Sequence, residues 1–317
     1  MKKSIYTIVI VLLTTTLLAS CSNSDSKVSS NSTSTNSTTA ITTSVLVTST
    51  EPIQTEKPEI SLINESGKTV ETRISTPEGF KRTSAVKGSL LEYMRNLELK
   101  PHGSPILYYD GNAKGSDNSY VAVFDFDVGE RDLQQCADCI MRIYSEYFLS
   151  RGEYDKIKFH LTNGFLMDYN TWRNGNRISV SGNNVSWVKK SSYDDSYESF
   201  REYLNGVMCY AGTISLVSEC TVIDKSEFRA GDMILKGSTP GHCVLAIDEA
   251  ENDAGEKCYL LAQGYMPAQS FHILTNPNAE DENNMWYYEK DLNFPIVTPG
   301  FTFNENEANI SRWNGGF

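Results

Sequence analysis

A tract of small polar residues near the start of the chain limits where a folded core can lie. From Ser22 to about Ser49 the sequence is mostly serine, threonine and asparagine, with few large apolar side chains. Such a segment buries too little apolar surface to offset the entropy of ordering its backbone. We therefore expect a flexible tether over residues 21–57 and a single globular domain over residues 58–317.

The residues before this tract have the layout of an export signal. Lys2 and Lys3 precede an apolar run over residues 5–18, which is short for a membrane-spanning helix. The run ends in Leu-Ala-Ser-Cys, and this ending resembles the bacterial lipobox. The resemblance implies that residues 1–20 are a cleaved signal peptide and that Cys21 carries lipid. We expect a lipoprotein of the cell membrane on the extracytoplasmic face; an uncleaved anchor helix is the alternative.

The charge of the chain restricts its partners. The formal net charge is −12 at pH 7, and loss of the two lysines of the signal makes it more negative. Proteins bind nucleic acid mainly through clustered positive charge. We therefore expect no nucleic-acid partner, and we expect the lipid on Cys21 to provide the contact with the membrane.

The cysteines other than Cys21 allow two interpretations. An exported protein can use them as a disulfide framework, but that device belongs mainly to small domains with weak cores. A long domain rich in aromatic residues favours mostly free thiols. Their spacing fits no common zinc pattern, and we expect neither a metal nor another cofactor. The six residues are Cys136, Cys139, Cys209, Cys220, Cys243 and Cys258.

The hydrophobic periodicity predicts an α+β fold, with early helices followed by an antiparallel sheet of short strands. Residues 118–128 alternate as a strand, and residues 130–152 then have helical spacing, with Asp132 as the expected N-cap and Gly152 as the expected stop. Residues 196–219 predict a second, largely buried helix. The remaining expected strands are 233–236, 242–248, 257–263 and 271–274, with two strand-like pieces between residues 156 and 180.

Cys136 is the candidate nucleophile. It falls near the start of its predicted helix, where the positive end of the helix dipole favours a thiolate. Burial in the core is the alternative, and nearby acidic residues would oppose the charge. A third interpretation is a redox dithiol with Cys139, in the sequence Cys-Ala-Asp-Cys.

His242 is the candidate general base, and Gln263 is the candidate group that orients it. A cysteine hydrolase needs an imidazole to take the thiol proton and a third polar group to fix the ring. If residues 242–248 and 257–263 form an antiparallel hairpin, the start of the first strand lies opposite the end of the second. The two side chains would then be neighbours. The alternative for Gln263 is a strand-end amide that bonds the backbone.

Other side chains are weaker candidates. His272, at another strand start, is the rival base and could line the same cleft. Asp125 and Asp127 could hold a cation, although no matching loop accompanies them. An aromatic platform for substrate, with core packing as the alternative, could be formed by Tyr169, Trp172, Arg173 and Arg177.

This order of features resembles the papain-like, NlpC-type cell-wall peptidases. In those enzymes a cysteine opens a helix, Gly-Asp begins the strand before the catalytic histidine, and a polar residue follows on the next strand. Gly231-Asp232 and Gly241-His242 match that layout. The resemblance implies a Cys-bearing helix packed on an antiparallel sheet that carries the histidine. It assigns no oxyanion side chain, because Gln134 and Gln135 are expected inside the helix and Glu130 stands where papain has its glutamine.

A broader resemblance covers most of the folded part. The segments "YYDGNAKG", "DLQQCADCIMRIYSEYF", "LTNGFLMDYNTWRNGNRIS", "PGHCVLAID" and "LLAQGYMPAQSFHIL" are similar to an uncharacterised bacterial family, domain of unknown function 4846. This resemblance implies one domain from about residue 60 onward, and it implies no activity.

Two functions follow from the sequence. The first is a lipid-anchored cysteine hydrolase, an amidase or peptidase acting on cell-wall peptides, with Cys136, His242 and Gln263 as catalytic residues. The second is a non-catalytic envelope lipoprotein that binds glycan or protein through the same groove.

Overall fold

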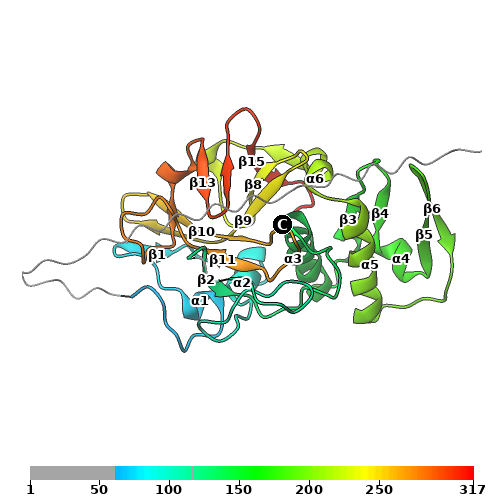
Figure 1. Ribbon diagram of the computed structural model, residues 1–317, viewed down its shortest axis with the longest axis horizontal. Coiled ribbons are helices and arrows are strands. Elements are labelled where there is room, and N and C mark those ends of the chain that lie inside the picture. The colour runs from blue at the N-terminus through cyan, green and yellow to red at the C-terminus, as the bar shows by residue number, and fades with distance from the viewer. Residues whose placement is uncertain (1–60, 116–117) are drawn as a thin grey trace, which may run out of the picture. The chain divides into compact units, whose positions relative to one another are not determined.

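A nine-stranded antiparallel sheet organises the part of the chain that the computed structural model describes, residues 61–115 and 118–317 (Figure 1). The strand order is β2-β11-β10-β9-β8-β15-β7, with β1 paired to β9 and β12 paired to β10. The signal peptide, Cys21 and the whole tether of residues 21–57 lie outside the described residues. The strands of this sheet are β1 (Phe80–Arg82), β2 (Tyr120–Val123), β7 (Cys220–Val222), β8 (Met233–Lys236), β9 (His242–Asn252), β10 (Lys257–Gln263), β11 (His272–Leu274), β12 (Tyr287–Tyr288) and β15 (Asn309–Trp313).

Helices and small hairpins surround this sheet, which confirms the expected α+β class. Three two-stranded hairpins stand apart from the main sheet: β3 (Lys158–His160) with β4 (Leu166–Asp168), β5 (Asn176–Ser181) with β6 (Asn184–Lys189), and β13 (Ile296–Thr298) with β14 (Phe301–Phe303). The α-helices are α1 (Val70–Arg73), α2 (Leu90–Arg95), α3 (Cys136–Ser150), α4 (Tyr169–Arg173), α5 (Tyr197–Tyr210) and α6 (Thr213–Glu219).

Both faces of the central strands are buried, because β9 divides its side chains between two hydrophobic clusters. Cys243, Leu245 and Ile247 belong to the larger cluster, which also contains the apolar stripe of α3. Val244 and Ala246 belong to a second cluster, together with residues of the β13–β14 hairpin. The period-two alternation of a strand explains this division. The helix that bears Cys136 therefore packs against one face of the strand that bears His242.

The strand predictions were accurate where a turn bounded an apolar run. β8 and β10 have the expected limits, and β9 continues four residues past Asp248. The strand expected over residues 118–128 is limited to β2, four residues long. Gly152, with a φ of 69°, follows the end of α3 as expected.

The single long helix expected over residues 196–219 was wrong. Ala211 is extended, with φ −100° and ψ 172°, and the chain then re-enters a helix at Thr213. Ile214 and Val217 were expected on the buried stripe, yet they are 46% and 47% exposed. α5 and α6 are thus separate helices, and only α5 keeps a continuous buried face.

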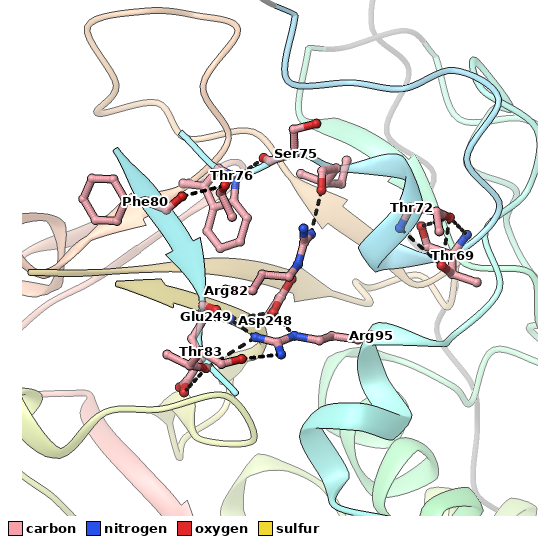
Figure 2. A network of polar contacts seen from close by, with 12 residues as sticks. Thr69, Thr72, Ser75, Thr76, Phe80, Arg82, Thr83, Arg95, Asp248 and Glu249 are labelled. Carbon is pink, nitrogen blue, oxygen red and sulfur yellow. Dashed lines mark hydrogen bonds and ion pairs between the residues drawn. The ribbon is translucent and has the colours of Figure 1, made fainter. Parts of the chain in front are cut away.

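A buried ionic network joins the early segment of the chain to the sheet (Figure 2). Asp248 of β9 has no exposed side-chain surface, and its carboxylate accepts from Arg95 Nε at 2.6 Å and from Arg82 Nε at 2.7 Å. Arg95 of α2 also donates to the carbonyl oxygens of Thr83 and Glu249. This network fastens β1 and α2 to the strand that begins with the candidate base.

The described residues belong to a compact unit spanning Lys57–Phe317. Within the described part, the helices are too short or too polar to span a bilayer. All six of its cysteines are free thiols, in agreement with the expectation from composition.

Candidate active site

Helix α3 begins at Cys136, the candidate nucleophile. Gln135 is the N-cap, with φ −89° and ψ −155°, and its backbone N–H donates to the Asp138 carboxylate at 3.1 Å. The expected N-cap, Asp132, was wrong. Its carboxylate instead accepts from Ala268 N at 2.7 Å and from the Gln135 amide at 2.9 Å. Cys136 is therefore the first helical residue.

This helix start also corrects the positions of two glutamines that were expected inside the helix. Gln134 and Gln135 both precede α3. The Gln134 side chain is buried, donates to Asp127 O at 3.1 Å and accepts from Arg142 Nη1 at 2.7 Å. Both the oxygen and the nitrogen of the Gln134 amide therefore have partners within the protein. The Gln135 side chain is partly exposed.

The β9–β10 hairpin brings His242 and Gln263 together, as the turn predicted. Ala262 pairs with Leu245 in an antiparallel register, and a bulge lies between Leu260 and Leu261. His242 Nε2 lies 2.7 Å from Gln263 Oε1. Both side chains are 3% exposed, and this contact is therefore shielded from water.

His272 fixes the direction of the Gln263 amide. His272 Nδ1 lies 2.8 Å from the carbonyl oxygen of Ser270, which can only accept, and the ring therefore presents Nε2 as an acceptor. Gln263 Nε2 points to that nitrogen at 3.4 Å and donates to Pro299 O at 3.3 Å. The amide oxygen thus faces His242 and accepts its Nε2–H. His272, the rival candidate for the base, therefore positions Gln263, the side chain that orients His242.

An aromatic wall, formed by Tyr265, Phe301 and Phe303, encloses the His242 ring. The ring centroids lie 4.9 Å, 4.8 Å and 5.7 Å from that of the imidazole, respectively. The Tyr265 hydroxyl donates to Gly300 O at 2.8 Å. This hydrogen bond connects Tyr265 to the β13–β14 turn, which precedes Phe301 and Phe303. Sequence analysis missed these residues because they come from distant segments.

Cys136 begins the helix that packs against β9, the strand that carries His242 and Cys243. Because Nε2 of His242 is bonded to Gln263, Nδ1 is the free ring nitrogen. The side chain of Cys243, and then that of His242, hold the pKa of Cys136 well below the usual value of a thiol, and burial opposes them. Cys136 itself is partly exposed.

Burial raises the pKa values of the ionisable side chains next to Cys136. Burial, followed by the contact with Cys136, raises the pKa of Cys243 well above its usual value. Burial and the nearby Cys136 charge likewise raise the pKa of Asp138, whose Oδ1 has no hydrogen-bond partner. Burial also raises the pKa of Cys139. Cys136 therefore has the lowest pKa of these three thiols.

This electrostatic arrangement predicts the pH dependence of Cys136 alkylation. Thiolate forms as pH rises through the pKa, so a lowered pKa moves the midpoint of the labelling rate toward neutral pH. Cys243→Ala removes the largest lowering contribution and should move that midpoint upward. Rates of iodoacetamide labelling as a function of pH, resolved by peptide mass spectrometry, give the midpoint for the unmodified chain and for the Cys243→Ala variant. Cys220 is the internal control because burial raises its pKa to about 12; equal midpoints for Cys136 and Cys220 would contradict the expectation.

The Gly-Asp pair of the expected motif has a structural role. Asp232, at the start of β8, has no exposed side-chain surface and is bound by Arg312 Nε and Nη2, each at 2.7 Å. The Tyr144 hydroxyl of α3 donates to Gly231 O at 2.8 Å. These contacts hold the Cys-bearing helix against the sheet beside the His-bearing strand.

The other candidates are engaged elsewhere. Asp127 pairs with Arg142 and Arg201, at 2.9 Å and 3.1 Å. No cluster of three potential metal ligands occurs among residues 61–115 and 118–317. The proposed aromatic platform is core, because Tyr169 and Trp172 are 0% and 6% exposed.

The fold and this site define an α+β protein in which a histidine and a glutamine meet at one end of an antiparallel hairpin, beside the start of a helix that begins with a cysteine. The chain belongs to the family described as domain of unknown function (4846), whose model matches residues 70–309. This confirms the broader resemblance seen in the sequence. No curated protein and no solved structure matches the chain.

Proposed function

We propose that this protein is a cysteine hydrolase that cleaves amide bonds in cell-wall peptides. One observation carries the proposal: the helix that begins at Cys136 starts directly beside the end of β10, where Gln263 is bonded to His242 Nε2. A nucleophile, a base and an orienting group in this order are the requirements of nucleophilic acyl transfer. The arrangement supports a papain-like, NlpC-type relation between α3 and the sheet.

The proposed reaction uses each of these groups in turn. The Cys136 thiolate attacks the carbonyl carbon, and His242 then gives its proton to the leaving amine. His242 next takes a proton from water, which hydrolyses the thioester and restores the thiolate. Gln263 holds the imidazole in one orientation throughout. The amide N–H groups of the first turn of α3 are the donors placed to stabilise the oxyanion.

The proposed location at the extracytoplasmic face of the membrane favours cell-wall peptides as the substrate. Lipid on Cys21 would keep the domain at the extracytoplasmic face of the cell membrane, through the tether of residues 21–57. The peptides of the cell wall are the amide-rich polymers of that compartment. The local Gly-Asp and Gly-His pattern adds weight to this class, because it resembles that of wall peptidases.

A second function, a non-catalytic lipoprotein that binds glycan, is favoured by a different observation. A cavity of about 780 Å³ adjoins the carbonyls that hold Gln263 and Tyr265. Its walls combine apolar surface with uncharged polar side chains, which suit the rings and hydroxyls of a neutral sugar. The lining includes Asn118, Tyr120, Thr275, Asn283, Pro299 and Gly300.

Incubation of the purified full chain with peptidoglycan separates the two functions. The hydrolase should release peptides with new amino and carboxyl ends, detected by mass spectrometry. Pretreatment with iodoacetamide, confined by mass analysis to Cys136, should abolish that release. Binding to the polymer without cleavage, together with equally slow labelling of all six thiols, would establish the binding protein and exclude the hydrolase.

A further inference from the structure

Three buried side chains form one hydrogen-bonded row behind the free nitrogen of His242. His242 Nε2 lies 2.7 Å from Gln263 Oε1, and Gln263 Nε2 lies 3.4 Å from His272 Nε2. The row ends at the carbonyl oxygen of Ser270, which lies 2.8 Å from His272 Nδ1. None of the three side chains is more than 3% exposed, so water does not compete for these contacts.

The carbonyl end of this row determines where every proton in it lies. A carbonyl oxygen can only accept, so a neutral His272 carries its proton on Nδ1 and offers Nε2 as an acceptor. This nitrogen and the carbonyl oxygen of Pro299, at 3.3 Å, are acceptors for the two N–H groups of the Gln263 amide. The amide oxygen is left for His242, whose proton must then be on Nε2.

The opposite direction of the amide would disable the proposed base. If the Gln263 amide turned over, its NH2 group would face His242 Nε2, and a neutral His242 would then carry its proton on Nδ1. A nitrogen that already holds a proton cannot take one from a thiol or from water. The turned amide would also place its oxygen against two acceptors, His272 Nε2 and Pro299 O. These two acceptors therefore act together as a clamp on the amide.

Packing holds the His272 ring in the place that this clamp requires. Its backbone pairs with Gln263 of β10 on one side and with Val123 of β2 on the other. Its ring lies edge-on to the ring of Tyr120, with the centroids 5.9 Å apart. The Tyr120 hydroxyl itself donates to Ser104 O at 3.3 Å. His272 is thus a fixed part of the sheet, and its ring has no exposed surface.

We propose that His272 is a positioning residue for the hydrolase. Through the Gln263 amide it fixes His242 in the tautomer that has a proton on Nε2 and a free Nδ1, the nitrogen that exchanges protons in the reaction. The two histidines therefore hold opposite tautomers. The catalytic consequence rests on the proposed function, whereas the tautomers are measured without substrate, so either proposal can fail alone.

The first test reads both tautomers in the full, unmodified chain. Long-range proton–nitrogen NMR spectra of the isotope-labelled protein show which nitrogen of each imidazole carries the proton. The chain has only four histidines, and substitution of each in turn assigns the signals. We expect the proton on Nδ1 of His272 and on Nε2 of His242. A proton on Nε2 of His272, or on Nδ1 of His242, would overturn the proposal.

The second test removes the His272 acceptor and then restores it. In His272→Leu a population of His242 with its proton on Nδ1 should appear, and kcat for wall-peptide cleavage should fall about three- to ten-fold at unchanged KM, because one hydrogen bond of the clamp is lost. His272→Gln can present a carbonyl oxygen to the Gln263 amide, and it should return the tautomer and bring kcat to within about two-fold of the unmodified chain. A fall in kcat without a change in the His242 tautomer would show a purely structural role and overturn the proposal.

His102→Leu is the matched control, because it makes the same substitution outside the row. His102 is 35% exposed and pairs with Glu65 at 3.7 Å. The tautomers of His242 and His272 should not change, and kcat should stay within about two-fold. Expected tautomers in an unmodified chain that cleaves no wall peptide would reject the hydrolase and keep the fixed tautomer of His242.

Discussion

Replacing Asp248 by alanine is expected to lower the free energy of unfolding by about 3–5 kcal/mol, because it leaves two arginines in the protein without their shared counter-ion. The Arg95 and Arg82 side chains are only 5% and 17% exposed, and neither can turn fully into water. Both would keep their carbonyl partners, but carbonyls do not neutralise the charge (Figure 2). Urea titration followed by tryptophan fluorescence measures the change.

Asp253→Ala is the matched control for this prediction. It also removes a carboxylate that pairs with a basic residue of β1, Lys81, at 3.2 Å. Those side chains are 79% and 91% exposed, and the loss should stay within about 1 kcal/mol. Equal effects of the two substitutions would show that the buried network does not hold the N-terminal segment to the sheet.

The sequence predicted those parts of the site that depend on local pattern. Alternation and a polar turn are enough to define a hairpin, and a hairpin dictates that its first and last residues are neighbours. The pattern of residues 242–263 is therefore enough to predict that His242 and Gln263 are neighbours. The helix at Cys136 was predicted from its spacing, but its first residue was not, because several side chains near a helix start can serve as caps.

Long-range pairing was beyond sequence analysis. β1 and β15 join β9 and β8 from opposite ends of the chain, and no local pattern encodes such a partner. The break at Ala211 was missed because the apolar stripe continues through it. The aromatic wall was missed because its members, from β14 and from the segment after β10, meet through long-range pairing.

The position of Cys243 on the face of β9 that packs against α3 follows in part from the strand pattern. Side chains alternate along a strand, so Cys243 must face opposite to His242. A helix packed on the apolar side of β9 would therefore meet Cys243 first. The local pattern does not say which face of β9 a helix covers, because the apolar surface of the whole sheet decides that.

His242→Ala is expected to separate two properties of the site. Hydrolysis of a wall peptide should fall by about 10²–10⁴-fold, because no group remains to protonate the leaving amine. Alkylation of Cys136 at neutral pH should fall less, since the hydrogen bond from Cys243 makes the larger contribution to the lowered pKa of Cys136. Steady-state cleavage and iodoacetamide labelling, measured on the same preparation, give the two numbers.

His160→Ala supplies the control for removing a histidine. His160 lies on β3, its side chain is 45% exposed, and it pairs with Glu219 at 2.8 Å, away from the hairpin. Both rates should remain within about two-fold of the unmodified chain. If His242→Ala lowered cleavage and alkylation by the same factor, His242 would act only by stabilising the thiolate. If it left cleavage unchanged, it would not be the base. A larger loss in cleavage than in alkylation is the result that a proton-transferring histidine requires, because alkylation consumes the thiolate and needs no acid.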